Sequence, residues 1–325
     1  MAETAGRITL WGIEVFVAAA EETSISAAAR RLGASPSAIS QQLTNLETAL
    51  GTALLNRGER PMTLTPAGEL FRRRAQSILN EAAQARAELA MQDLSRLTTL
   101  RLGMIEDFDA NVTPRLLQGM AGTLTGAQFL LETGASHHLL DLLEARALDM
   151  IVAAEMGVEA DWMEVHPILE EPVVAAVPRG AVAEGADIMA TLRQLPLIQY
   201  TQRHHMGRAI AAHLARQNLR LGHRFELDSY HAIMAMVAAG LGWTILTPLG
   251  FLHAHRFRDQ ADVLPLPFRP LTRTISLTAR RGILQGMPAD VAQDLRGLVS
   301  ELIVAPGLAR MPWLDGALRV LGPER

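Results

Sequence analysis

Residues 24–68 read SISAAARRLGASPSAISQQLTNLETALGTALLNRGERPMTLTPAG. Ser35 followed by Pro36 predicts the start of a helix, because a serine side chain caps the first amides and proline loses no hydrogen bond at the first helical position. Gly51 predicts the end of that helix. Apolar residues recur at spacings of three and four, which predicts one buried face over residues 36–50: Ile39, Leu43, Leu46 and Leu50.

The opposite face of this helix is polar. It carries Ser37, Ser40, Gln41, Thr44 and Asn45. Upstream, residues 27–32 favour a short helix, and Gly33 with Ala34 favours a tight turn. Two helices joined by a tight turn, the second with a polar face, are typical of a helix-turn-helix that reads base edges in the major groove of DNA.

Residues 52–66 favour two short strands around a polar tip, Arg57-Gly58-Glu59-Arg60. This pattern indicates a wing whose arginines can reach phosphates or the minor groove. Thr65 and Pro66 then predict the start of another helix by the same combination of cap and proline.

This stretch is similar to the winged helix-turn-helix of LysR-type transcriptional regulators. The residues that match the family's order and spacing are Phe16, Ser24, Ala28, Ala29, Leu32, Ser35, Ser40, Leu46, Glu47, Leu50, Gly51, Leu54, Arg57, Leu64, Thr65, Ala67 and Gly68. One departure is Leu55, where the family usually has phenylalanine; it exchanges one apolar side chain for another.

The resemblance implies that the helix over 36–50 enters the major groove of an interrupted palindrome. For base-edge contacts we expect Ser37, Ser40 and Gln41. For phosphate or groove-edge contacts we expect Ser35, Gln42, Arg57, Arg60 and Thr63. The alternative for Ser35 and Ser40 is helix capping and plain solvent exposure.

The 325 residues include no cysteine, which excludes a disulfide scaffold, a thiol redox sensor and a cysteine-ligated metal centre. The net charge of −4 does not favour nucleic-acid binding, and every basic residue is an arginine, so DNA affinity must depend on where arginines are placed. We find neither a signal-peptide pattern nor an apolar run long enough to span a membrane, and therefore expect a cytoplasmic protein.

From Pro66 to about Ser95 the composition is helical, and the family uses this segment as the helix that dimerises. Beyond residue 99 strands alternate with helices, which predicts parallel βαβ units. The expected strands are 100–105, 128–132, 149–154, 171–178, 197–200, 224–227, 243–246 and 273–278. The expected helices are 111–120, 138–145, 206–217, 230–239 and 289–303. The family plan places these elements in two α/β lobes joined by two crossing strands.

The expected fold is therefore an N-terminal winged helix-turn-helix, mainly α, with a long linker helix and a two-lobed α/β effector domain like a periplasmic binding protein. We expect the DNA-binding domain over 1–66, the linker helix over 67–97 and the effector domain over 98–305. Lobe one is expected at about 100–169 and 274–304, and lobe two at about 170–273. The tail, 306–325, runs past the usual end of the family and packs either on a lobe or on a neighbouring subunit.

Open α/β lobes bind ligands where strands end, in the crevice between the lobes. The effector residues expected from four such loops are Asp107, Phe108, Ala135, Ser136, His137, Thr201, Gln202, Arg203, His204, Ser229 and Tyr230. The acids of the first loop, Glu106, Asp107 and Asp109, suit an amine, and Arg203 suits a carboxylate. Together they indicate a zwitterion, such as an amino acid or a related amino compound. The alternative is that these acids are solvated or favour the dipole of the following helix.

Five histidines in these loops leave open a metal-responsive regulator: His137, His138, His204, His205 and His231. Adjacent histidines point in different directions, so we expect no metal site. No P-loop, dinucleotide fingerprint, GxSxG or HExxH motif appears, so we expect neither an enzyme nor catalytic residues. A cytosolic solute-binding or sensor protein, and a nucleoid-type architectural protein, compete with the regulator from different functional classes.

The sequence thus predicts a bacterial, ligand-responsive transcription regulator without a bound cofactor. Its expected partners are double-stranded DNA at a promoter or operator, a small-molecule effector, RNA polymerase and further copies of the chain, as a dimer or tetramer. A ligand in the cleft would favour one closure of the lobes and change how the paired winged helices sit on DNA.

Overall fold

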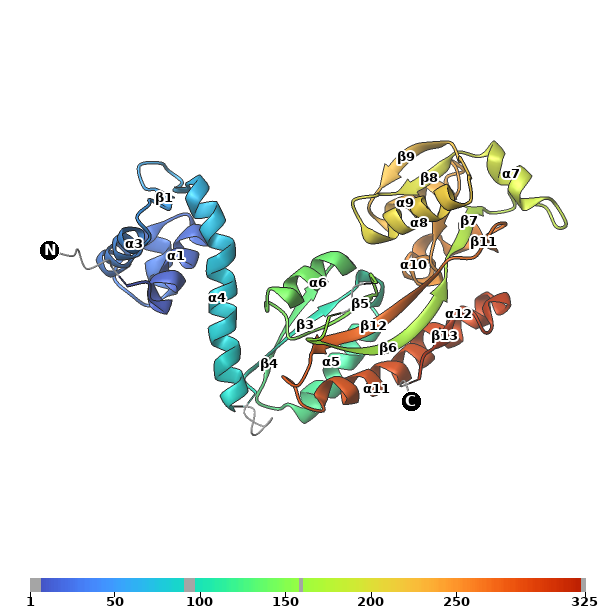
Figure 1. The fold of residues 1–325 in the computed structure, drawn as a ribbon. Helices are drawn as coiled ribbons and strands as arrows, with labels where there is room; N and C mark the ends of the chain where they lie inside the picture. The colour runs from blue at the N-terminus through green and yellow to red at the C-terminus, as the bar shows by residue number, and fades with distance from the viewer. Residues whose placement is uncertain (1–6, 91–96, 158–159, 323–325) are drawn as a thin grey trace. The chain divides into compact units, whose positions relative to one another are not determined.

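A computed structural model describes residues 7–90, 97–157 and 160–322 (Figure 1). The chain divides into two compact units, residues 1–92 with 145–147, and residues 93–144 with 148–325. Each unit is described separately below. No helix of the described residues is both long and apolar enough to cross a lipid bilayer.

The first unit packs three helices against the start of a longer one. Its elements are α1 (Leu10–Glu22), α2 (Ile25–Arg31), α3 (Pro36–Leu50), β1 (Leu55–Asn56), β2 (Thr63–Leu64) and α4 (Pro66–Ala90). The predicted helix over 36–50 is confirmed at both ends. The Ser35 side chain accepts from the Ala38 amide, and Gly51 adopts φ 68°, a left-handed conformation that glycine takes without strain. The predicted end of the linker helix, Ser95, lies outside the described residues.

The core of this unit forms where apolar faces of these helices meet. Phe16, Ile39 and Leu43 are fully buried there, and the rings of Phe16 and Phe71 lie 5.2 Å apart. The apolar stripe expected on α3 is therefore its packed face: Ile39, Leu43 and Leu46 are buried. Burial of this stripe leaves the opposite face of α3 in solvent.

The second unit contains two α/β lobes. Lobe one is a six-stranded sheet in the order β13-β6-β12-β5-β3-β4, in which β3 runs parallel to β4 and β5. Its elements are β3 (Thr99–Met104), the 3-10 turn Glu106–Phe108, α5 (Val112–Thr123), β4 (Gln128–Thr133), α6 (Ser136–Glu144), β5 (Met150–Ala154), β6 (Met163–Pro172), β12 (Thr272–Arg280), α11 (Met287–Val299) and β13 (Arg319–Val320).

Lobe two contains a three-stranded sheet, β10-β7-β11, and a parallel pair, β8-β9. An isolated bridge between Leu197 and Trp243 connects the two sets. Its elements are β7 (Val174–Pro178), α7 (Ile188–Gln194), β8 (Leu197–Tyr200), α8 (His205–Arg216), β9 (His223–Leu227), α9 (Tyr230–Ala238), β10 (Thr244–Leu246), α10 (Pro248–His253), the 3-10 helix His255–Gln260 and β11 (Ala261–Pro265).

The lobes are joined by β6 and β12, which pair antiparallel along their whole length (Figure 1). The single strand predicted over 171–178 is wrong: β6 ends at Pro172, and β7 begins at Val174 in the other sheet. The chain therefore changes sheets within one residue. As a result, Glu171 lies at the crossing between the lobes, where it is fully buried.

The tail packs on its own unit. After α11 the helix continues through a π-helical stretch, Ser300–Val304, into α12 (Ala305–Arg310) and the 3-10 turn Pro312–Leu314. Strand β13 pairs with β6, and the Leu321 amide donates to the Ile168 carbonyl at 2.8 Å. Leu314 and Leu318 are buried, which answers the choice left open by the sequence in favour of packing on the chain's own lobes.

Candidate DNA-binding surface and effector pocket

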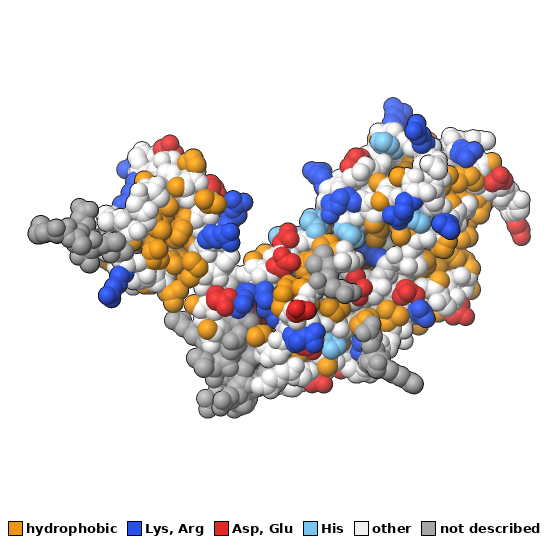
Figure 2. Space-filling model, viewed as in Figure 1, with side chains coloured by type: hydrophobic (Ala, Val, Ile, Leu, Met, Phe, Trp, Pro, Cys, Tyr) orange, Lys and Arg blue, Asp and Glu red, His pale blue; other side chains and the backbone are white. Residues whose placement is uncertain are grey.

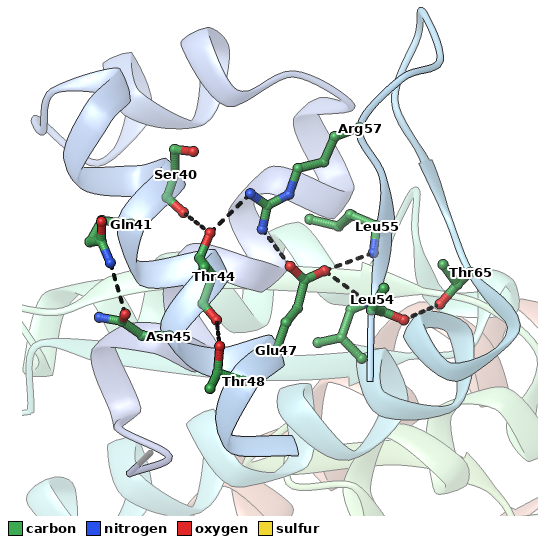
Figure 3. Close-up of polar contacts among 11 residues, drawn as sticks. Ser40, Gln41, Thr44, Asn45, Glu47, Thr48, Leu54, Leu55, Arg57 and Thr65 are labelled. Carbon is green, nitrogen blue, oxygen red and sulfur yellow. Dashed lines mark hydrogen bonds and ion pairs between the residues drawn. The ribbon is translucent and has the colours of Figure 1, made fainter. Parts of the chain in front are cut away.

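The solvent face of α3 presents polar side chains in a row (Figure 3). Ser37, Gln41, Thr44 and Asn45 are exposed. The Gln41 amide donates to the Asn45 side chain at 2.9 Å, and the Thr44 hydroxyl donates to the Ser40 carbonyl at 3.0 Å. Because Gln41 and Asn45 are one turn apart, their amides form one donor and acceptor surface, suited to base edges.

Three predicted contact residues, Ser35, Ser40 and Gln42, are engaged in a cap or partly buried, unlike the exposed Gln41. The Ser35 hydroxyl accepts from the Ala38 amide at 3.2 Å and lies 3.0 Å from the Ser37 hydroxyl. Ser40 and Gln42 are half-buried. Capping by Ser35 fixes the first turn of α3, the part of a recognition helix that lies closest to DNA in this motif.

Glu47 holds the wing against α3 (Figure 3). Its Oε1 accepts from the amides of Leu54 and Leu55, at 2.8 and 3.2 Å. Its Oε2 pairs with the Arg57 guanidinium at 2.5 Å, and that guanidinium also donates to the Thr44 hydroxyl at 3.1 Å. Both carboxylate oxygens are therefore engaged, and Arg57 joins the wing to the polar face of α3.

The tip of the wing is free to face a partner. Strands β1 and β2 pair Leu55 with Leu64, and the turn between them exposes Arg60. Among the described residues Arg60 makes no ion pair, whereas Thr63 donates to the Glu59 carboxylate. Of the two arginines predicted at the tip, Arg57 thus has an internal role as well, and Arg60 is available as a phosphate contact.

A pocket of about 60 Å³ lies between the lobes of the second unit. Lobe one, lobe two and the crossing strand β12 all contribute to its wall. The lining residues are Ile105, Glu106, Asp107, Gly134, Ala135, Ser136, Ala154, Tyr200, His204, His205, Met206, Tyr230 and Arg273. Histidine side chains gather along the boundary of the two lobes on the face drawn in Figure 2.

A buried ion cluster forms one wall of this pocket. Arg273 donates to the Asp107 carboxylate of lobe one at 2.6 Å and to Glu171 Oε1 on β6 at 2.6 Å. It also lies 3.2 Å from the Thr247 hydroxyl of lobe two, and Glu171 Oε2 accepts from the Leu249 amide at 3.0 Å. One guanidinium therefore links both lobes and the crossing strand.

The charges in this cluster set its pKa values in opposite directions. Burial raises the pKa of Glu171, and the neighbouring Arg273 opposes that rise. The carboxylates of Glu171 and Asp107 raise the pKa of Arg273 against its burial, so the guanidinium stays charged. Because donors occupy both Glu171 oxygens, the contacts favour its ionised form, and two carboxylates then face one cation.

Asp107 has one oxygen without a hydrogen bond. The side chain is 6% exposed, and its Oδ1 has no partner among the described residues. The tyrosines opposite are stacked, with ring centroids 4.9 Å apart, and burial raises the pKa of both Tyr200 and Tyr230, so they stay neutral. A buried acceptor without a donor is costly, which marks Asp107 Oδ1 as a pocket atom that lacks a hydrogen-bond donor.

Burial lowers the pKa of two histidines near the pocket, His137 and His205. Burial, Arg208 and His137 lower the pKa of His205, and burial together with His204 lowers the pKa of His137. The rings of His137 and His204 lie 5.6 Å apart, one from each lobe. His137 and His204 therefore place polar rings on both sides of the lobe boundary.

Five of the eleven predicted effector residues line the pocket: Asp107, Ala135, Ser136, His204 and Tyr230. The other six lie outside its lining: Phe108, His137, Thr201, Gln202, Arg203 and Ser229. Phe108 is fully buried, and Ser229 caps α9. Arg203, expected to meet a carboxylate, is 81% exposed and lies 3.9 Å from Asp228.

Arg273 is the basic residue of the pocket wall that sequence reasoning missed. It begins a predicted strand, and no motif around it distinguishes it from the other arginines. The available signal was its place at the start of a crossing strand, opposite Glu171 at the start of EPVVAAVP. Among the described residues, no group of three or more histidine, aspartate or glutamate side chains is placed to hold a metal ion.

Two family descriptions match the chain: "Bacterial regulatory helix-turn-helix protein, lysR family" over residues 10–69, and "LysR substrate binding domain" over residues 95–294. A relative from Mycobacterium avium, described as "Probable hydrogen peroxide-inducible genes activator", is 31% identical over 308 residues, which is 93% of this chain and 97% of that protein. The DNA-binding transcriptional dual regulator OxyR of Escherichia coli K12 is 26% identical, covering 83% of this chain and 88% of that protein.

Solved structures share the fold. Full-length OxyR from Pseudomonas aeruginosa, a cysteine-to-aspartate variant, has a TM-score of 0.66 at 23% identity and covers 89% of this chain and 95% of its own. Full-length CbnR in complex with its target DNA has a TM-score of 0.61 at 20% identity, with 90% of this chain and 100% of that chain covered. With both parts of the chain matched, the protein belongs to the LysR family of bacterial transcriptional regulators.

Proposed function

We propose that α3 and the wing bind operator DNA and that a small effector in the pocket between the lobes adjusts this binding. The observation that carries the DNA half is the solvent face of α3, which presents Ser37, Gln41 and Asn45 while its apolar face is packed. Around it, Ser35, Ser40, Gln42, Arg57, Arg60 and Thr63 complete the proposed contact surface. Selection of bound sequences from random duplex DNA by the full chain tests this proposal, and recovery of no preferred sequence would overturn it.

Gln41→Ala is expected to relax base preference at one position of each half-site. A glutamine amide that bonds one base bidentately gives about 1–3 kcal/mol of discrimination against the wrong base. The measurement compares dissociation constants for the selected operator and its single-base variants. A companion variant is Asn45→Ala, which removes the 2.9 Å partner of Gln41 together with one amide of the same exposed surface. An equal loss of affinity on every sequence would contradict the base-reading role of Gln41.

Arg60→Ala is expected to weaken binding to all DNA sequences alike. An arginine that neutralises a phosphate releases one counterion, so its removal lowers the slope of log K against log salt by about 1. The measurement is a salt titration of operator and random DNA. Arg193→Ala, an exposed arginine at the end of α7 in the second unit, is the control and is expected to leave the slope unchanged. An unchanged slope for Arg60→Ala would remove it from the phosphate contacts.

The effector half rests on the pocket. It lies where both lobes and a crossing strand meet, so a bound molecule would contact elements that move apart when the lobes open. The proposed effector residues outside its lining, such as His137 and Arg203, would act only in a different closure of the lobes. A ligand can shift this equilibrium only through different contacts in the two closures.

The relatives named for hydrogen peroxide suggest a stimulus, but this chain cannot answer it with a thiol. Sulfenic acid and disulfide formation both need a cysteine sulfur, and the 325 residues contain none. We therefore propose that the effector binds reversibly, without covalent chemistry. The test is reversal: dilution or dialysis should restore the unliganded DNA affinity without a reductant.

The remaining parts of the proposal follow family membership. We propose a non-enzymatic regulator that acts in the cytoplasm, associates through α4 as a dimer or tetramer and contacts RNA polymerase at promoters. The proposed domains remain 1–66, 67–97, 98–305 and 306–325. Support for oligomerisation comes from the exposed apolar side chains Leu70 and Ile78 on α4, since a helix with an uncovered apolar stripe needs a partner.

A further inference from the structure

We infer that the pocket between the lobes takes a small primary ammonium group, held by Asp107 and Glu106. This inference rests on the proposed effector role of the pocket and names the class of its ligand. The starting observation is the free Oδ1 of Asp107, on a side chain that is 6% exposed. Its other oxygen is held by Arg273 at 2.6 Å, so the carboxyl group is fixed in place with one oxygen still free to accept a hydrogen bond.

The charge of the pocket favours a cation. Besides histidines and tyrosines, the ionisable residues of the lining are two acids, Glu106 and Asp107, and one base, Arg273. Arg273 is already shared by two carboxylates, at 2.6 Å each, and Glu106 makes no ion pair within the described residues. Burial and Arg208 keep His205 neutral by lowering its pKa, so this neighbour does not supply the missing positive charge.

The aromatic wall suits the same group. Tyr200 and Tyr230 line the pocket as a stacked pair, with centroids 4.9 Å apart. Tyr230 lies close against Gly250 of α10, where an added Cβ would be 3.0 Å from the ring, so the ring is fixed in place. The three N–H groups of a small ammonium can reach a carboxylate and a hydroxyl together.

The size of the pocket limits the ligand. A volume of about 60 Å³ accommodates a molecule of a few heavy atoms rather than an aromatic acid. The first turns of α6 and α8 border the same space, at Ser136 and His205. The ligand class expected from the sequence, a zwitterion, is thereby narrowed to a small amine. Asp107 and Glu106 are the acids that would hold it, whereas Arg273 is already paired with Asp107 and Glu171.

The test is calorimetric titration of the full chain with methylammonium, against three probes of similar size: methanol, acetate and hydrogen peroxide. Methanol matches methylammonium in shape without its charge. We expect saturable binding of methylammonium alone. Loss of a hydrogen bond to a charged group corresponds to about tenfold or more in affinity, so Asp107→Asn should weaken binding by at least that factor.

Two further variants keep the test decisive if Asp107→Asn disturbs folding. Glu106→Gln removes an exposed carboxylate without breaking any ion pair of the described residues, and should weaken methylammonium binding several-fold. Asp109→Asn, in the same loop but outside the lining, should leave it unchanged. Binding of acetate, methanol or peroxide in place of methylammonium, no saturable binding, or binding that ignores Glu106 would overturn the inference.

The two proposals fail separately. If the chain binds a selected DNA sequence but not methylammonium, the proposal of a DNA-binding regulator is kept and the proposed ligand class is wrong. If no preferred DNA sequence is recovered, the regulator proposal fails whatever the calorimetry shows.

Discussion

Arg273→Ala should lower the free energy of unfolding of the second unit by about 3–5 kcal/mol, the cost of leaving buried charges without their partner. Glu171 is fully buried, and its Oε1 would lose a donor at 2.6 Å. Asp107 would lose its donor as well and keep two unpaired oxygens. The structure offers no second cation at this point among the described residues, since Thr247 supplies only a hydroxyl.

Urea unfolding of the full chain measures this loss, and Arg319→Ala is the matched control. Arg319 pairs with Glu170, the residue next to Glu171 on β6, but its side chain is 56% exposed. An exposed ion pair contributes at most about 1 kcal/mol. Similar losses for the two variants would show that the buried cluster carries no special weight in stability.

The loss should also depend on pH. In the wild type burial raises the pKa of Glu171, and Arg273 is the main influence that lowers it. Without Arg273 the raised pKa is unopposed, so the folded variant binds a proton that the unfolded chain has already released. The free energy of unfolding that such a group contributes is lost as pH rises through its folded pKa. We therefore expect Arg273→Ala to be less destabilised at pH 5 than at pH 8, and a loss independent of pH would contradict an ionised Glu171.

The DNA-binding unit could be predicted because its signals are local. Ser35, Pro36 and Gly51 determine where α3 begins and ends, and the spacing of Ile39, Leu43 and Leu46 determines which face is buried. The polar face then follows by exclusion. Each of these inferences needs only residues within one helix of the chain, where sequence distance and spatial distance are nearly the same.

The pocket was predicted only in part because its wall joins distant segments. The sequence located the loop with Asp107 and the one with Tyr230, since both follow expected strands. It could not show that Arg273, which is 166 residues from Asp107 along the chain, lies 2.6 Å from the Asp107 carboxylate in space. It favoured Arg203 instead, because that residue lies in a strand-end loop, yet its side chain points to solvent.

The change of sheet between β6 and β7 was missed for a physical reason. Residues 171–178 read as one apolar run, and an apolar run does not indicate that the chain changes sheets. The change at Val173 is what places Glu171 on β6 with its Oε2 against the amide of Leu249 at the start of α10. Glu171 thereby connects the crossing strands with lobe two through Arg273 and the Leu249 amide. Composition alone cannot indicate this role.

Glu47→Ala should lower the stability of the first unit by about 2–4 kcal/mol and weaken operator binding in the same variant. One side chain accepts from the amides of Leu54 and Leu55 and pairs with Arg57 (Figure 3). Hydrogen bonds to a charged group contribute about 1.5–3 kcal/mol. In the variant, the partly buried amides of Leu54 and Leu55 would be left without an acceptor. The wing would then lose its attachment to α3 on the strand β1 side.

Glu47→Gln separates the two roles of this side chain. Glutamine keeps an acceptor oxygen for the Leu54 and Leu55 amides but removes the charge that pairs with Arg57 at 2.5 Å. It should therefore retain slow hydrogen exchange at those two amides, whereas Glu47→Ala should lose it. If the two amides exchange as fast in Glu47→Gln as in Glu47→Ala, the ion pair with Arg57 rather than the amide hydrogen bonds orients the wing. If neither loses DNA affinity, the wing binds its partner without help from α3, and the contact surface is reduced to the helix itself.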